Sequence, residues 1–191
     1  MKKIIKIVTL LLVLNGCSSE NKSVNSCNET NSTFNQLYNS VVLTHFDGFG
    51  YAREVHSYNF EVLSNKTICK IGYQSRASMS TVPYLIEIID NTSNTTLYSE
   101  NNIFSSTSTS YIAITPILLT VGHSYTIKRI QVNWGSNFGD PEGRVVSDAV
   151  GDINFPITYG ELRITGGASY DLNNPVQDNQ KIPYIDLVFE N

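Results

Sequence analysis

The stretch that decides the fold runs from Pro83 to Ile89 and reads PYLIEII. It is dense in aromatic, aliphatic and β-branched residues, which favour strands. The apolar run is nearly continuous and its proline falls at the first residue, so the sequence predicts a central, well-buried strand. The next residues, 90–94, are turn formers, and β-forming residues return over Thr95–Ser99. The two segments are therefore predicted to form a hairpin with a short loop.

Strand patterns continue on both sides of this hairpin. Large apolar residues alternate with polar ones over residues 58–62 (YNFEV), and Cys69, Ile71 and Tyr73 share one face of the segment that follows. Further strands are predicted over residues 111–115, 124–132, 161–165 and 184–189. Many short strands separated by turns, without a long helical period, predict an all-β fold that forms a single β-sandwich over residues 34–191.

One segment has a helical pattern. Its apolar residues are spaced as a single helical stripe: Phe34, Leu37, Tyr38 and Val41. Ser32 or Thr33 is a suitable N-cap, so the spacing predicts a short helix over residues 33–41. Residues 41–43 fit the start of a strand equally well.

Proline and glycine residues mark the interruptions of the strand pattern. Pro116 interrupts the apolar segment that continues over residues 117–119. Residues 133–152 and 166–181 have no strong period and are predicted to be loops at one end of the sandwich. Loops of this length exceed the usual 4–6 residues or so, and long loops on a rigid scaffold often carry function.

These two loops hold the candidate binding residues. Trp134, Phe138 and Tyr170 are aromatic residues of the kind that stack on sugar rings or anchor protein partners, although a lone tryptophan at a strand end more often caps the core. The first loop also contains acidic residues whose oxygens suit calcium: Asp140, Glu142, Asp148 and Asp152. The alternative is a polar surface loop in which Arg144 balances part of the charge. No other cofactor is predicted.

The order of the β-forming pieces is similar to that of a family of bacterial domains of unknown function, found in secreted and often carbohydrate-active proteins. The matching pieces lie within residues 55–191, at residues 58–62, 67–73, 96–99, 116–125 and 184–189. The resemblance implies a jelly-roll-like sandwich. It brings no catalytic residues to this chain and leaves the function open.

The N-terminus carries an export pattern. Three lysines, Lys2, Lys3 and Lys6, precede an apolar run that ends in Leu14-Asn15-Gly16-Cys17. This ending resembles the lipobox of bacterial lipoproteins, in which a diacylglyceryl group is added to the cysteine and the signal is cut before it. The resemblance implies a signal peptide over residues 1–16, acyl chains such as palmitate on Cys17, and anchorage in the cell envelope, with outer-membrane sorting expected. The alternative is an ordinary secretory signal followed by a chance cysteine.

Residues 17–33 are expected to form a flexible tether, because residues 18–33 are almost entirely polar and cannot bury enough apolar surface to fold. If Cys17 carries lipid, Cys27 and Cys69 remain, and an oxidising compartment permits one disulfide between them. Two unpaired thiols, with Cys69 buried in a strand, are an equal alternative.

The charge of the chain limits its partners. A net charge of −4 argues against nucleic-acid binding and against electrostatic docking on anionic lipid. The expected membrane contact is therefore the lipid on Cys17.

No pattern in the sequence predicts an enzyme. There is no Gly-x-Ser-x-Gly elbow, and the three histidines, His45, His56 and His123, lack metal-binding spacing. The strand carboxylates Glu61, Glu87 and Asp186 are expected on solvent faces. The predicted function is a non-catalytic, lipid-anchored binding protein whose ligand is a glycan or a surface protein. The alternatives are a structural subunit of an envelope complex and a hydrolase with unrecognised carboxylates.

Overall fold

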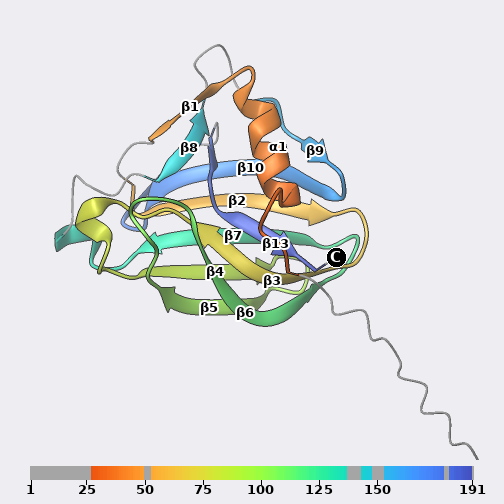
Figure 1. Ribbon diagram of the computed structural model, residues 1–191, viewed down its shortest axis with the longest axis horizontal. Helices are drawn as coiled ribbons and strands as arrows, with labels where there is room; N and C mark the ends of the chain where they lie inside the picture. The colour runs from red at the N-terminus through yellow and green to blue at the C-terminus, as the bar shows by residue number, and fades with distance from the viewer. Residues whose placement is uncertain (1–26, 50–52, 137–142, 148–152, 179–180, 191) are drawn as a thin grey trace, which may run out of the picture.

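A computed structural model describes residues 27–49, 53–136, 143–147, 153–178 and 181–190. Antiparallel sheets packed against one another account for most of it, which confirms the predicted all-β sandwich (Figure 1). The elements in chain order are α1 (Thr33–Val42), β1 (Phe46–Phe49), β2 (Val55–Val62), β3 (Lys66–Tyr73), η1 (Ala77–Met79), β4 (Tyr84–Asp90), β5 (Thr95–Asn102), β6 (Ser110–Leu119), β7 (Ser124–Gln131), η2 (Trp134–Ser136), β8 (Arg144–Ser147), β9 (Ile157–Tyr159), β10 (Leu162–Asp171), β11 (Asn174–Asp178), β12 (Ile182–Pro183) and β13 (Asp186–Phe189).

The strands form one large sheet and two small ones. The large sheet has the order β11-β10-β2-β7-β4-β5, with β9 also pairing with β10. A second sheet, β13-β3-β6, packs in front of it in Figure 1, and a third, β1-β8-β12, lies above. Within the described residues, no helix is long and apolar enough to cross a membrane.

The hairpin predicted from PYLIEII forms as β4 and β5. Side chains of β4 alternate strictly between buried and half-buried, so Tyr84, Ile86 and Ile88 enter the core while its other face looks outward. The Asp90 carboxylate accepts hydrogen bonds from the backbone N–H groups of Thr92 and Ser93, at 2.9 and 3.2 Å, which fixes the turn.

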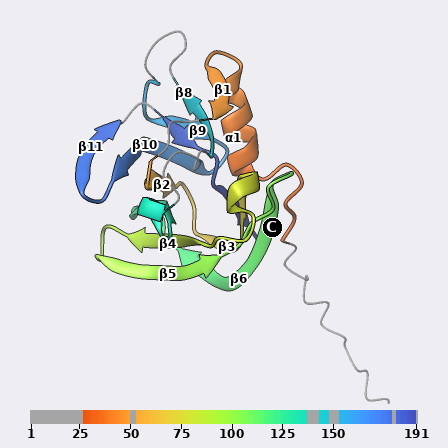
Figure 2. The ribbon, with the colours of Figure 1, turned by 90° about the vertical axis from the view of Figure 1, so that its left-hand side faces the viewer.

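Helix α1 forms where the apolar stripe predicted it. The Ser32 hydroxyl accepts the N–H of Asn35 at 3.0 Å and caps the helix. Phe34 stacks on Tyr58 of β2, with ring centroids 5.2 Å apart, and meets Tyr184 edge to face at 5.5 Å. The helix thus fills the space beside β9, β10 and β13, whereas the β4–β5 hairpin and β6 lie at the other side of the molecule (Figure 2).

The two ends of the sandwich differ in construction. At one end, which we call the turn end, short turns contact one another: Asn91 N–H donates to the Ser124 carbonyl, Val121 N–H to Asn65 Oδ1, and Leu63 N–H to the Glu161 carbonyl. At the other, the loop end, lie η1, η2, the start of β2 and the hairpin between β10 and β11. Figure 1 shows the loop end at the left and the turn end at the right.

Two predicted loops were wrong in part. Residues 166–181 are mostly strand, because β10 continues to Asp171 and β11 pairs back with it. The tandem glycines 166 and 167 mimic a breaker, but both lie within β10 and pair with β2. Glycine is needed at position 167 because any side chain there would collide with the backbone carbonyl of Lys181. The segment 133–152 likewise contains β8.

Pro116 does not break its strand. β6 continues through Pro116 because it is an edge strand that pairs only with β3. A residue on the open side of an edge strand has no neighbouring strand to receive a backbone N–H, so proline is tolerated there. The register between β3 and β6 shifts between Ile68 and Lys70, opposite this region.

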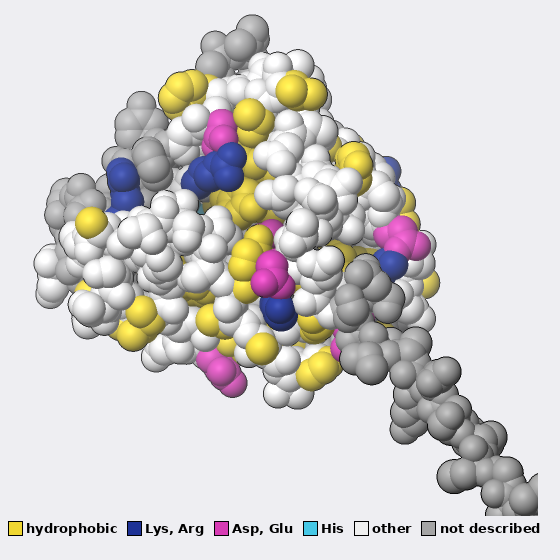
Figure 3. All heavy atoms as spheres, in the orientation of Figure 1, with side chains coloured by type: hydrophobic (Ala, Val, Ile, Leu, Met, Phe, Trp, Pro, Cys, Tyr) yellow, Lys and Arg dark blue, Asp and Glu magenta, His cyan; other side chains and the backbone are white. Residues whose placement is uncertain are grey.

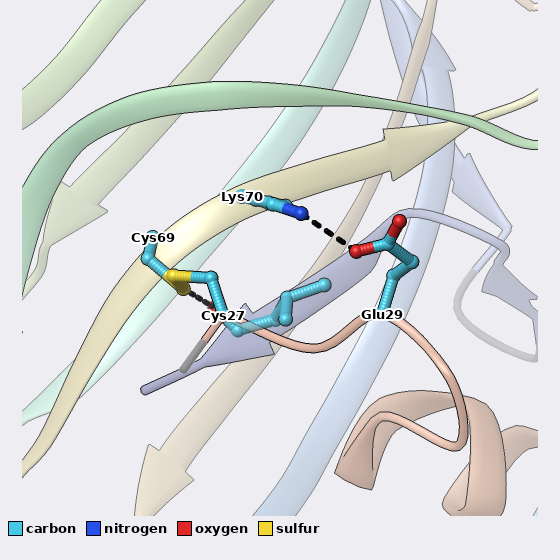
Figure 4. The surroundings of a disulfide bond; sticks show 5 residues. Cys27, Glu29, Cys69 and Lys70 are labelled. Carbon is cyan, nitrogen blue, oxygen red and sulfur yellow. Dashed lines mark hydrogen bonds and ion pairs between the residues drawn. A yellow bond between two sulfur atoms is a disulfide. The ribbon is translucent and has the colours of Figure 1, made fainter. Parts of the chain in front are cut away.

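The expected flexible tether does not extend to residue 33. Cys27 forms a disulfide with Cys69 of β3, with Cα atoms 6.1 Å apart, and Lys70 donates to Glu29 at 2.6 Å beside it (Figure 4). This hydrogen bond lowers the pKa of the Glu29 carboxyl. Residues 27–33 are therefore tied to the second sheet by covalent and ionic links that composition alone does not reveal.

Candidate functional site

The outward face of the large sheet brings together chemistry from four strands. Register pairs Tyr170 of β10 with Val55 of β2, Val55 with Ile130 of β7, and Ile130 with Leu85 of β4. Because paired residues in a sheet share a face, these four form one mainly apolar row. The row begins close to the loop end.

A polar row runs beside this apolar one. Ser57, Lys128, Glu87 and Ser99 are consecutive register partners across β2, β7, β4 and β5. The Lys128 ammonium lies 3.9 Å from Glu87 Oε2, and Ser99 donates to Glu87 Oε1 at 3.3 Å. Both charged side chains remain about a quarter exposed, at 25% for Lys128 and 23% for Glu87.

Tyr170 lies in the apolar row, and a charge in the polar row also affects its phenol. Burial raises the pKa of its phenol, and the negative charge of Glu87 raises it further. Glu87 therefore acts on Tyr170 although two strands separate them. We call Val55, Leu85, Glu87, Lys128, Ile130 and Tyr170 the Tyr170 surface.

Val55 forms the floor of this surface. Val55 lies on the face of β2 opposite to Tyr58 and Phe60, whose side chains point into the core, and yet it is fully buried. In register it lies between Tyr170 and Ile130.

One ion pair and two hydrogen bonds hold the strand ends next to Tyr170. Asp171 receives Arg53 Nη1 at 2.9 Å and the Glu54 backbone N–H at 3.0 Å. In return, Glu54 Oε2 accepts the N–H of Leu172 at 2.9 Å. These bonds clamp the start of β2 to the β10–β11 turn and fix the position of Tyr170.

A hollow of about 300 Å³ adjoins the surface. It lies beside Thr165–Ala168 of β10 and is also lined by Ser57, Asn59 and Phe155. Gly166 faces Asn59 in register and carries no side chain, which leaves the hollow open. Asn59 Oδ1 accepts a hydrogen bond from Thr126 at 2.7 Å, so its amide is held in place.

The structure groups part of the predicted binding residues. Tyr170 and Ile130 both neighbour Val55, and Trp134 begins η2 directly after β7, so Trp134 and Tyr170 lie at the same end of the same sheet. Trp134 is half-buried, so its exposure does not decide between a side chain that caps the core and one that is available to a ligand. Phe138 lies outside the described residues.

The calcium prediction falls outside the described residues, since Asp140, Glu142, Asp148 and Asp152 all do. Elsewhere, the described part of the chain contains no cluster of three or more metal-binding side chains. Arg144 does pair with a carboxylate, but this is Asp47 of β1, which it contacts at 2.6–3.1 Å. Its guanidinium also lies over the rings of Tyr38 and Tyr184, at 5.0 and 4.8 Å.

Asp186 was expected on a solvent face, and this was wrong. It is completely buried and accepts hydrogen bonds from Ser32 at 2.6 Å and Tyr111 at 2.9 Å. Burial raises the pKa of its carboxyl to about 6, and the two hydrogen bonds oppose that shift. Glu61 and Glu87 are half-exposed, as predicted for outward strand positions.

A buried cation was missed in the sequence analysis. Arg129 of β7 is fully buried between the rings of Tyr73 and Tyr84, 5.8 and 5.2 Å from their centroids. Its Nη1 donates to the backbone carbonyls of Arg53 and Glu54 at 3.4 and 3.3 Å. Arg129 thus supports, from inside, the segment that clamps Tyr170 from outside. The predicted alternation along β7 could have signalled it, since Arg129 falls on the apolar face.

The histidines do not form a site together. His56 is buried on β2, His45 lies just after α1, and His123 contacts Asp90 in the turn end at 2.8 Å. Burial alone would raise the pKa of Asp90, but hydrogen bonds, led by that of His123, lower it.

No family model matches this chain, and a search of the curated proteins finds no relative. The two resemblances drawn from the sequence therefore remain expectations.

Proposed function

We propose that this protein is a lipid-anchored, extracytoplasmic binding protein of the bacterial cell envelope, and that it binds a glycan on the Tyr170 surface. The anchor rests on the lipobox-like Leu14-Asn15-Gly16-Cys17. Export is supported by the Cys27–Cys69 disulfide, because such bonds persist in oxidising compartments.

The observation that carries the glycan proposal is the pairing of an apolar row with a polar row on one sheet face. A sugar ring has an apolar C–H face and a rim of hydroxyl groups. Tyr170 offers a ring for the first, and Lys128 and Glu87 offer a donor and an acceptor for the second. The surface is partly exposed and mixed in charge, which suits a neutral ligand better than an anionic one.

Glycan binding can be tested with the mature protein on an array of envelope and cell-surface glycans, followed by calorimetry on any ligand found. Tyr170→Ala should weaken binding at least tenfold, because stacking and ordered contact area are lost. Tyr159→Ala removes an exposed tyrosine from the turn end and is the matched control, with binding unchanged. Equal effects of both substitutions, or binding untouched by either, would reject the Tyr170 surface.

One observation favours the second candidate, an assembly subunit that binds an envelope protein. The edge strands β5 and β6 line a groove of about 460 Å³ between residues 97–100 and 113–117. Edge strands present free backbone groups, so an extended segment of a partner could pair there. Thr115→Pro would remove a backbone donor from β6 and should abolish crosslinking to such a partner. If crosslinking survives Thr115→Pro but is lost with Tyr170→Ala, the partner binds the Tyr170 surface instead.

A further inference from the structure

The described residues expose eight large hydrophobic side chains, and four of them lie at the turn end. They are Leu63 (48% exposed), Leu118 (65%), Val121 (50%) and Tyr159 (40%). We call these four the turn-end patch. Figure 3 shows hydrophobic side chains around acidic and basic ones at this right-hand end of the molecule.

Contacts between turns bring the patch together. The Val121 N–H donates to Asn65 Oδ1, which joins the β6–β7 turn to the β2–β3 turn. Leu63 N–H donates to the Glu161 carbonyl, which joins the β2–β3 turn to the end of β9, where Tyr159 lies. Leu118 is the penultimate residue of β6, opposite Thr67 in register.

The anchored end of the chain enters at the same place. Thr67 precedes Cys69 by two residues, and Cys69 is bonded to Cys27. Cys27 lies ten positions after Cys17. An unstructured chain of that length spans on the order of 18 Å on average and about 35 Å at most. A lipid on Cys17 would therefore hold the bilayer within a short distance of Leu118.

Charged side chains beside the patch have polar partners. Lys66 forms an ion pair with Glu161, and His123 contacts Asp90. The patch thus combines aliphatic side chains and one tyrosine with an apolar body and a polar tip, and an ion pair lies beside it. Such a set suits the interface of a bilayer, and its binding needs no anionic lipid.

We infer that the turn-end patch is a membrane-contact surface, which inserts into the headgroup region when Cys17 is anchored and fixes the domain with its loop end pointing away from the bilayer. This inference rests on the proposed lipid anchor. It adds a second membrane contact, formed by folded residues, and an orientation that places the Tyr170 surface toward the outer medium.

The test uses the full-length lipidated protein reconstituted in phosphatidylcholine vesicles, part of whose acyl chains are brominated to quench nearby tryptophan. In a Trp134→Phe background, Val121→Trp places one tryptophan in the patch, and Ile103→Trp places one at the loop end, on a residue that is slightly more exposed (57% against 50%). We expect bromolipid to quench the tryptophan at position 121 several-fold more strongly than the one at position 103, unchanged by high salt.

The two proposals fail in different ways. If the protein carries no lipid and does not float with vesicles, the anchor is refuted. If it floats but positions 121 and 103 are quenched equally, or neither is quenched, the membrane-contact surface is refuted and the anchor stands. Leu118→Ser is a second variant on the patch. It should weaken residual vesicle binding of the delipidated protein, and no change would count against the patch.

Discussion

The hydroxyl of Ser32 donates a 2.6 Å hydrogen bond to the buried carboxylate of Asp186, 154 residues away in the sequence. The same hydroxyl accepts the Asn35 N–H that begins α1. One side chain therefore couples the start of the helix to the last strand, and does so through a carboxyl group that titrates near neutrality.

This coupling predicts a pH dependence of stability. The pKa of Asp186 is about 6 in the folded protein and about 3.8 as a free side chain. The folded state therefore holds a proton between pH 4 and 6 that the unfolded state has lost, so this group's contribution to stability falls as pH rises through that window. The loss is on the order of 3 kcal/mol and is complete above pH 7.

Asp186→Asn removes the titration while keeping a polar group of the same shape. The free energy of unfolding of the variant minus that of the wild type should rise by about 3 kcal/mol between pH 4 and pH 7. Chemical denaturation at both pH values measures it. Two curves that stay parallel across this range would show that Asp186 does not titrate as its burial implies.

The disulfide should stabilise the fold through the unfolded chain. Closing a loop with a sequence separation of 42 residues limits the unfolded ensemble by about 4 kcal/mol. The double variant Cys27→Ala with Cys69→Ala should lose about this much stability. Reducing agent should lower the wild type to the level of the double variant and leave the variant itself unaffected. If reduction changes both equally, another process accounts for the loss.

Replacing Arg129 should lower the free energy of unfolding much more than replacing its neighbour Lys128. Arg129→Met keeps much of the volume but removes the cation between Tyr73 and Tyr84 and the donors to the carbonyls of residues 53 and 54. We expect a loss of roughly 2–4 kcal/mol in urea denaturation. Lys128→Met, on the same strand but facing outward, should change stability by less than about 0.5 kcal/mol. Similar losses for both would show that the burial of Arg129 carries no special contribution.

The anchor prediction concerns processing. Cys17→Ala should leave an unprocessed precursor without a lipid label, since only the thiol can receive the diacylglyceryl group. Metabolic labelling with a radioactive fatty acid and the size of the product measure it. Cys27→Ala is the matched control and should be labelled normally, and label on the Cys17→Ala variant would refute the lipobox interpretation.

The elements predicted correctly are those that depend on short-range sequence patterns. The helix over 33–41, the β4–β5 hairpin and the long β7 each follow from short-range periodicity and turn chemistry, and the structure contains all three. Tyr170 was picked out by its residue type and its place in the predicted loop 166–181. The structure places it in β10, on the outward face of the large sheet, and its part in binding stays a prediction.

The parts that sequence reasoning missed depend on contacts between distant strands. Pro116 continues a strand because β6 happens to be an edge, and Gly167 is needed because Lys181 approaches it. Asp186 is buried because α1 supplies a hydroxyl from the other end of the chain. Lys128 and Glu87 meet only through the strand order β2-β7-β4, which no single-strand pattern encodes.

The position of the disulfide also decides how the domain would carry mechanical load. The covalent loop from Cys27 to Cys69 encloses α1, β1 and β2. Tension applied at the N-terminal side of Cys27 therefore passes through the sulfur bridge straight into the middle of β3, which is held between β13 and β6. The helix and the strand that carries Val55 lie between the two cysteines, so the covalent path of this tension bypasses them. Because the bridge closes residues 27–69 into a loop, tension on the chain cannot extend that segment while the disulfide is intact.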